Sequence, residues 1–359
     1  MLNFTVGPVM SNEEIRKIGG EQIPYFRTSE FSKIMLDSES LLKKFFKAKD
    51  SSKVIFMTGS GTASMDASVL NLFTKNDKIL VVNGGSFGHR FCEICSVYDL
   101  DYTEIKCELG KTLTKEQLVP YDNKGYTAFI VNLDETSTGV LYDINLISDF
   151  CKKNNLFLLV DSISSFLCDP FDMDKLNVNC VITGSQKALA LAPGISLIVV
   201  DDKAIDRIYK NNPKTYYFNL KDYLDNGKRG QTPFTPAVGI LLQLNRRLHM
   251  IEDIGGIDVE VKRAEMSAKY FRDLIKELPF EIVSDNLSNA VTPLSPKDES
   301  KSAYKLFELL KDNYGIWVCP NGGNLKDKIF RVGHIGDIKN SDYDKLIYSI
   351  KDIIKKNLW

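Results

Sequence analysis

Residues 156–165 read Leu-Phe-Leu-Leu-Val-Asp-Ser-Ile-Ser-Ser, a short apolar run followed by a carboxylate and a cluster of small residues. An unbroken apolar run of this length is typical of a strand that is buried on both faces. Asp161 would therefore lie at the carboxyl end of a strand, where open α/β sheets bind their ligands. The alternative is that Asp161 only caps the next helix.

Similar apolar runs recur on both sides of this stretch and alternate with helix-like stretches at 63–73 and 145–153. This alternation predicts βαβ units and an α/β fold with a mostly parallel sheet in a large domain. The predicted strands are Lys53–Met57, Lys78–Val82, Thr127–Val131, Leu156–Val160, Asn179–Thr183 and Ile195–Val200.

The rhythm changes after about residue 250, where a long amphipathic helix is followed by short strands and two more helices. This pattern predicts a smaller C-terminal α+β domain. We expect an N-terminal segment at 1–20, a large domain at 21–250 and a small domain at 251–359. The predicted elements after residue 250 are helices Val259–Leu278, Ser302–Asp312 and Asp342–Leu358, and strands Phe280–Val283, Gly315–Val318 and Lys328–Val332.

The composition is that of an ordinary soluble globular protein, with 43% hydrophobic and 26% charged residues and a formal net charge of −1. No basic tract predicts a nucleic-acid or membrane partner. The first residues lack a basic and then apolar leader, so a cytoplasmic location is expected. The odd count of seven cysteines argues against a disulfide framework, and the lone pair Cys92 and Cys95 lacks the second pair that a metal site needs.

Lys187 is a second candidate for chemistry. It follows the predicted strand at 179–183 and precedes a run of small and apolar residues, Ala188–Gly194. An apolar environment lowers the pKa of a lysine and makes its amine a nucleophile.

Two glycine-rich loops also follow predicted strands. Gly59–Ser64 contains Ser60, Gly61 and Thr62 at the start of a helix, which suits a phosphate group, although it could be a simple strand–helix turn. In the loop Gly84–Arg90, Phe87 could stack on a planar ring or anchor the loop. A phosphate cradle, a stacking aromatic, a carboxylate and a desolvated lysine are together what a pyridoxal phosphate (PLP) site requires.

The chain resembles the class V, fold-type I aminotransferases over essentially its whole length. The resemblance rests on an ordered series of motifs: Asn3–Val9, Gly59–Ala63, Glu135–Gly139, Asp161–Ser165, Gly184–Leu189, Thr232–Pro236 and Phe330–Gly333. It implies the fold-type I architecture of PLP transferases.

The resemblance implies a cofactor role for nine residues. Lys187 would form the Schiff base and Asp161 would pair with the pyridinium nitrogen. Phe87 would stack on the ring, and Thr136, or less favourably Thr138, would bind its hydroxyl. The phosphate would be held by Ser60, Gly61, Thr62 and Gln186, together with Thr235 of a second subunit, which implies a homodimer with shared sites.

The resemblance also places Arg331 and Gly7 at the substrate. It implies transfer of an amino group from a small donor, alanine or serine, to a small 2-oxo acid, glyoxylate or pyruvate. Asn132 departs from the family, because many relatives have histidine there. Arg229 is a possible second cation for the substrate anion.

Three alternatives remain open. The opening Asn3–Val9 and the stretch at 161–166 also resemble 2-aminoethylphosphonate–pyruvate aminotransferases. A cysteine desulfurase-like lyase shares the fold, but it would usually have histidine where Gln186 stands and a catalytic cysteine in a late loop, and Cys319 is the only late cysteine. A cofactor-binding regulator would need a DNA-binding domain for which the chain has no room.

Overall fold

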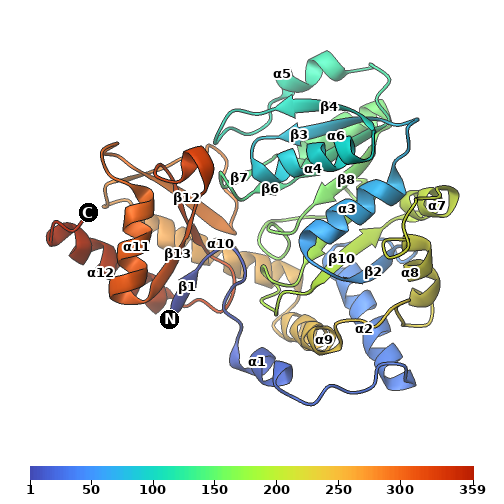
Figure 1. Cartoon of the computed structure of the whole chain (residues 1–359), viewed down its shortest axis with the longest axis horizontal. Helices are drawn as coiled ribbons and strands as arrows, with labels where there is room; N and C mark the ends of the chain where they lie inside the picture. Colours follow the sequence, from blue (N-terminus) through green and yellow to red (C-terminus); the bar gives the residue numbers. More distant parts are fainter.

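Two β-sheets, of seven and five strands, organise the molecule (Figure 1). The computed structural model describes residues 1–359. The architecture is mixed α/β with a central, mostly parallel sheet, as the sequence predicted. None of the helices has both the length and the apolar character required to cross a membrane.

The seven-stranded sheet contains all six strands predicted before residue 250. Its strands are parallel except β10, which runs antiparallel to both of its neighbours. β10 follows β9 after the short loop that carries Lys187, and parallel neighbours would need a longer crossover connection. The order is β2 (Lys53–Thr58), β10 (Ile195–Val200), β9 (Cys180–Gly184), β8 (Phe157–Asp161), β5 (Ala128–Asn132), β3 (Lys78–Asn83) and β4 (Asp101–Lys106).

Helices cover both faces of this sheet because alternate strand residues point to opposite sides. Leu80 and Phe129 belong to one core cluster, and their neighbours Ile79 and Ala128 belong to the other. The first cluster includes side chains of α2 (Ser29–Phe45), α6 (Ile144–Asn154) and α9 (Val238–Asp253). The second includes side chains of α3 (Gly61–Leu72), α4 (Ser86–Val97), α7 (Asp202–Lys210) and α8 (Leu220–Gly227).

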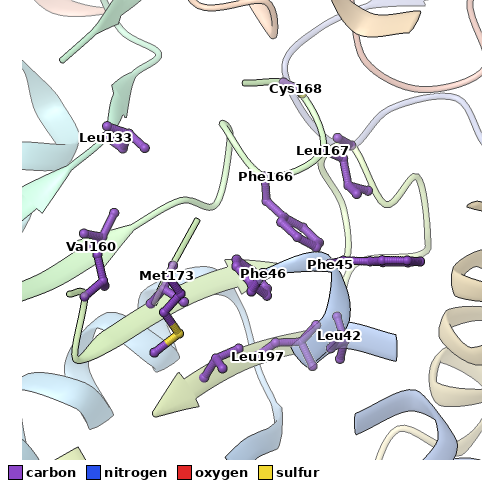
Figure 2. Packing of buried hydrophobic residues seen from close by; sticks show 14 of the residues in the cluster. Leu42, Phe45, Phe46, Leu133, Val160, Phe166, Leu167, Cys168, Met173 and Leu197 are labelled. Carbon is purple, nitrogen blue, oxygen red and sulfur yellow. The ribbon is translucent and has the colours of Figure 1, made fainter. Parts of the chain in front are cut away.

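The loop after Asp161 is anchored by aromatic packing. Phe166 stacks on Phe46 with ring centroids 4.1 Å apart and an interplanar angle of 10°. Figure 2 shows this pair beside Leu42 and Met173 in the core. Buried aromatic pairs of this kind stabilise a fold beyond their burial of area alone. The packing of Phe166 on Phe46 therefore stabilises the turn that follows Asp161.

The five-stranded sheet joins both ends of the chain. Strand β1 (Leu2–Phe4) pairs in parallel with β13, so the first residues pack on the C-terminal sheet, and Figure 1 shows β1 in blue among the orange elements. The order is β1, β13 (Ile316–Pro320), β14 (Phe330–Gly333), β12 (Val291–Pro296) and β11 (Phe280–Ile282). Helices α10 (Ile257–Ile275), α11 (Ala303–Tyr314) and α12 (Asn340–Lys355) build its core.

The remaining elements are short. A two-stranded hairpin, β6 (Asp134–Glu135) and β7 (Val140–Leu141), carries the loop 136–139 between the two sheets. The others are α1 (Glu13–Gly19), α5 (Lys115–Leu118) and the 3₁₀ turns η1 (Val119–Tyr121) and η2 (Gly323–Leu325).

Candidate active site

A cavity of about 180 Å³ opens at the carboxyl ends of the parallel strands. It brings together eight of the predicted site residues, which come from five separate stretches of the chain. They are Ser60, Gly61, Thr62, Phe87, Thr136, Asp161, Gln186 and Lys187. Asn132, Arg90, Met65, Ile163 and Ser164 complete the wall.

Lys187 reaches this cavity from the loop between β9 and β10. Its Nζ donates a hydrogen bond of 2.6 Å to the carbonyl oxygen of Val6. No carboxylate forms an ion pair with this amine, and burial lowers the pKa of Lys187 below its ordinary value. A larger share of the amine is therefore neutral and nucleophilic than for a lysine in water.

Asp161 ends strand β8 and is 1% exposed. Its Oδ1 accepts from the backbone N–H of Ile163 at 2.8 Å, and its Oδ2 accepts from Asn132 Nδ2 at 3.1 Å. Burial raises the pKa of Asp161 to about 6. Because no cationic side chain bonds this carboxyl group, a cationic ligand group beside it would favour its ionised form.

The start of α3 forms the predicted cradle. Ser60 occupies the cap position, yet its hydroxyl makes no capping hydrogen bond and lines the cavity. A Cβ added to Gly61 would lie 2.5 Å from Ile163 Cδ1, so a larger residue there would have to displace the end of the Ile163 side chain. Across the cavity, Oε1 of Gln186 is buried without a partner. Unpaired groups at a helix N-terminus are suited to an anion such as phosphate.

Phe87 lies in the first turn of α4, and Glu135 holds that turn in place. Glu135 Oε2 accepts from the backbone N–H groups of Phe87 and Gly88, both at 3.0 Å. Its Oε1 accepts from the Ser137 hydroxyl at 2.6 Å. A carboxylate at this helix end is favourable for the helix dipole as well as for these donors. The predicted stacking residue is thus fixed to the loop that carries Thr136.

The loop 136–139 contains both threonines that the sequence left as alternatives, and their surroundings differ. Thr136 lines the cavity. The hydroxyl of Thr138 instead donates to the carbonyl oxygen of Glu135 at 3.3 Å and is fully buried. Of the two hydroxyl groups, that of Thr136 is the one positioned to meet a ligand.

Arg331 in β14 is 8% exposed and links the five-stranded sheet to the loop 136–139. Its Nη1 donates to the carbonyl oxygen of Thr136 at 2.9 Å, and its Nη2 donates to that of Pro320 at 2.6 Å. Its Nε is buried without a partner. Arg331 does not line the cavity itself, but it retains an unsatisfied donor behind the loop that does.

Three other predicted residues, Gly7, Thr235 and Arg229, lie outside the cavity wall. Thr235 is exposed, and Arg229 is an exposed residue that bonds Asn226 at 2.7 Å. Cys319 lies within β13 rather than in a flexible loop, which disfavours the desulfurase-like alternative.

Reasoning from the sequence assigned no role to Arg90 or Glu135. Both stand in quoted motifs, and the spacing of three residues between Phe87 and Arg90 places them on neighbouring turns of one helix face. That spacing was a usable signal for Arg90. Two of the Glu135 bonds come from Ser137 in the same motif, but its partners Phe87 and Gly88 come from a distant loop, and no local pattern indicated these.

Solved structures of aminotransferases share this fold. The structure of an alanine–glyoxylate aminotransferase from Nostoc sp. superposes with a TM-score of 0.91, covering 98% of this chain and 95% of that one at 20% identity. The fold is therefore that of the fold-type I aminotransferases. The class-V aminotransferase family model matches residues 24–320.

Curated relatives of similar sequence are named aminotransferases. An uncharacterized aminotransferase of Methanocaldococcus jannaschii is 34% identical over 92% of this chain and 86% of its own length. The L-aspartate–glyoxylate aminotransferase of Paracoccus denitrificans is 26% identical over 94% of this chain and 87% of its own. The chain belongs to the class-V aminotransferases and is an aminotransferase.

Proposed function

We propose that the chain uses PLP to move an amino group from a small donor, alanine or serine, to a small 2-oxo acid, glyoxylate or pyruvate. The observation that carries this proposal is the placement of Lys187 and Asp161 on one cavity. The lysine amine bonds a backbone carbonyl and no carboxylate, and the aspartate accepts from an amide and no cationic side chain.

The cavity wall fits PLP at three points. Asp161 is a buried carboxyl group that would pair with the ring nitrogen. The start of α3 and the side-chain NH₂ group of Gln186, which can donate, lie at a space suited to the phosphate. Phe87 and Thr136 would meet the ring face and its hydroxyl.

The residues of this chain would perform the following chemistry. When bound, PLP supplies an electron-accepting ring that stabilises negative charge on the donor carbon. The amine of Lys187 would take a proton from the donor carbon as general base and deliver it to the cofactor carbon as general acid. Asp161 in its ionised form keeps the ring nitrogen protonated. Arg331 orients the substrate anion with a planar guanidinium group.

The choice of acceptor is supported by the relatives. Glyoxylate is named as a substrate of both the Paracoccus relative and the Nostoc structural neighbour. The donors that those names carry differ, aspartate in one and alanine in the other. The donor is therefore the more open half of the proposal, and 2-aminoethylphosphonate remains an alternative to be tested directly.

A half-reaction panel tests the proposal. The PLP-loaded protein is mixed with alanine, serine, aspartate or 2-aminoethylphosphonate, and the loss of lysine-bound cofactor absorbance is followed. The aminated form is then mixed with glyoxylate or pyruvate. Alanine or serine with glyoxylate should give the highest kcat/KM. A preference for the phosphonate donor would replace this substrate assignment with the alternative.

Lys187→Ala is the control for the chemical role. It should remove the lysine-bound absorbance and abolish turnover, whereas full activity in this variant would overturn the proposed chemistry.

We also propose a homodimer in which Thr235 reaches the phosphate of the other subunit. The exposure of Thr235 outside its own cavity supports this arrangement. Mixing Lys187→Ala subunits with Thr235→Ala subunits should restore activity, because one site of each heterodimer would then be intact. A fully active monomer at high dilution would contradict shared sites.

A further inference from the structure

Arg90 is a cation on the cavity wall that no carboxylate neutralises. It lies in α4, one turn after Phe87, and none of the ion pairs in the molecule includes it. Lys187 is the other cationic residue among those that line the cavity. Since Lys187 would hold PLP through its amine, Arg90 would be the guanidinium cation that this wall keeps for the phosphate.

The guanidinium of Arg90 determines how the Thr62 hydroxyl can bond. Nη1 of Arg90 donates to Thr62 Oγ1 at 3.1 Å. A guanidinium group has donors only, whereas a hydroxyl has one proton and two lone pairs. Thr62 therefore accepts from Arg90 and keeps its own proton for another acceptor. Thr62 is the second residue of α3, where backbone N–H groups also lack helical partners.

The same guanidinium lies over the ring of Phe87. Its central carbon is 4.9 Å from the ring centroid, within the range of a cation–π interaction. Arg90 thus contacts both Thr62, in the phosphate cradle of α3, and Phe87, the residue that would stack on the ring. Thr62, Phe87 and Arg90 form one connected unit.

We infer that Arg90 is a positioning residue for the cofactor phosphate, which it favours by its charge and by orienting the Thr62 hydroxyl proton toward it. This inference rests on the proposed function, because it assumes that PLP is the ligand. A hydrogen bond to a charged group is worth more than a neutral one, so the Thr62 proton gains most when it faces a phosphate dianion. The prediction is a contribution specific to the phosphate group.

Cofactor binding to the apoprotein tests this inference without reference to turnover. Affinities for PLP and for pyridoxal, which lacks the phosphate, are measured by quenching of intrinsic fluorescence for wild type, Arg90→Met, Thr62→Val and the double variant. Arg90→Met should weaken PLP binding about tenfold or more and pyridoxal binding by a much smaller factor. The double variant should lose less than the product of the two single losses, because the residues act through one another.

Matched variants separate charge from fold. Arg16→Met removes an exposed guanidinium from α1, away from the cavity, and should leave both affinities unchanged. Arg90→Lys keeps the positive charge but lacks the planar set of guanidinium donors, so its PLP affinity should lie between those of wild type and Arg90→Met. It also keeps the inference testable if Arg90→Met does not fold.

Three outcomes would overturn the role of Arg90: unchanged PLP affinity in Arg90→Met, equal losses for PLP and pyridoxal, or losses that multiply fully in the double variant. If wild-type protein binds no PLP at all, the proposed function itself fails. Normal PLP binding in wild type with any of the three outcomes would instead reject Arg90 alone.

Discussion

Gly7 packs directly against the side chain of Lys187. A Cβ added to Gly7 would lie 2.8 Å from Lys187 Cδ and 3.1 Å from the carbonyl oxygen of Gln186. The residue before it, Val6, accepts the hydrogen bond of the lysine amine. The segment after β1 therefore lies against Lys187, although β1 belongs to the five-stranded sheet and Lys187 lies between two strands of the seven-stranded sheet.

Gly7→Ala should damage cofactor attachment. Gly7 has φ +132°, a conformation that alanine adopts only with strain, and the new methyl group would displace the lysine. We expect a stability loss of about 1–3 kcal/mol and a slower appearance of the lysine-bound absorbance after PLP is added to the apoprotein. Gly125→Ala is the control, because Gly125 has φ +73° but no heavy atom near the added Cβ. If both variants attach PLP at the wild-type rate, the contact is unimportant.

Glu135→Gln should disturb Phe87 without touching the cavity directly. The carboxylate accepts four hydrogen bonds, from two groups of Ser137 and from the N–H groups of Phe87 and Gly88. An amide would turn an NH₂ group toward some of these donors, at a cost of about 1–3 kcal/mol. The displaced ring should change the circular dichroism of the bound-cofactor band.

Thr138→Val removes one hydrogen bond from the same turn and is the comparison for Glu135→Gln. It should lower stability while leaving that circular dichroism band unchanged. Identical spectra for wild type and Glu135→Gln would show that Phe87 does not depend on Glu135.

Arg331→Lys should raise the KM for donor and acceptor. The guanidinium group bonds two carbonyl oxygens and still has a free buried Nε, a combination that a single ammonium cannot reproduce. We expect kcat/KM to fall about tenfold to a hundredfold for alanine, and less for 2-aminoethylphosphonate, whose tetrahedral group gains less from a planar fork. PLP affinity should change little. Unchanged kinetics with every donor would mean that another residue binds the substrate anion.

Sequence reasoning located the strand ends well because buried runs such as 157–160 are short, apolar and followed by polar residues. The same logic missed β4, whose residues Asp-Tyr-Thr-Glu-Ile-Lys form a largely unburied edge strand. It also missed β12, where Pro293 and Pro296 obscure a strand that pairs with β14 and β11. Propensity disfavours proline in strands, and here tertiary pairing overrides it.

The site was predictable where a motif joins neighbouring residues, as in Ser60–Thr62. It was not predictable where distant segments meet. The contact of Gly7 with Lys187 brings together segments that follow strands of the two different sheets, and the bonds from Glu135 to Phe87 and Gly88 join the hairpin to the start of α4. No periodicity within either segment encodes such contacts.

Asp134 makes the stability of the apoprotein depend on pH. It precedes Glu135 in β6, is fully buried, and neither of its carboxyl oxygens has a hydrogen-bond partner. Burial, with a further contribution from nearby Asp169, raises the pKa of Asp134 to about 8. The folded state therefore holds a proton at pH 7 that the unfolded chain has released, because the ordinary pKa of an aspartate is about 4.

The sign of the effect follows from this difference in bound protons. Stability from Asp134 is fully present below pH 4 and declines as pH rises toward 8, by at most about 1.4 kcal/mol per pH unit. Asp161 and Asp169 contribute in the same direction, but mainly below pH 6, because burial raises their pKa values to about 6.

Asp134→Asn cannot ionise, so the stability of this variant should fall less than that of wild type between pH 6.5 and 8. Denaturant midpoints of the two apoproteins at pH 5.5, 6.5 and 8 measure this, with Asp50→Asn, an exposed change, expected to follow wild type. Parallel curves for wild type and Asp134→Asn would show that Asp134 is already ionised in the folded protein.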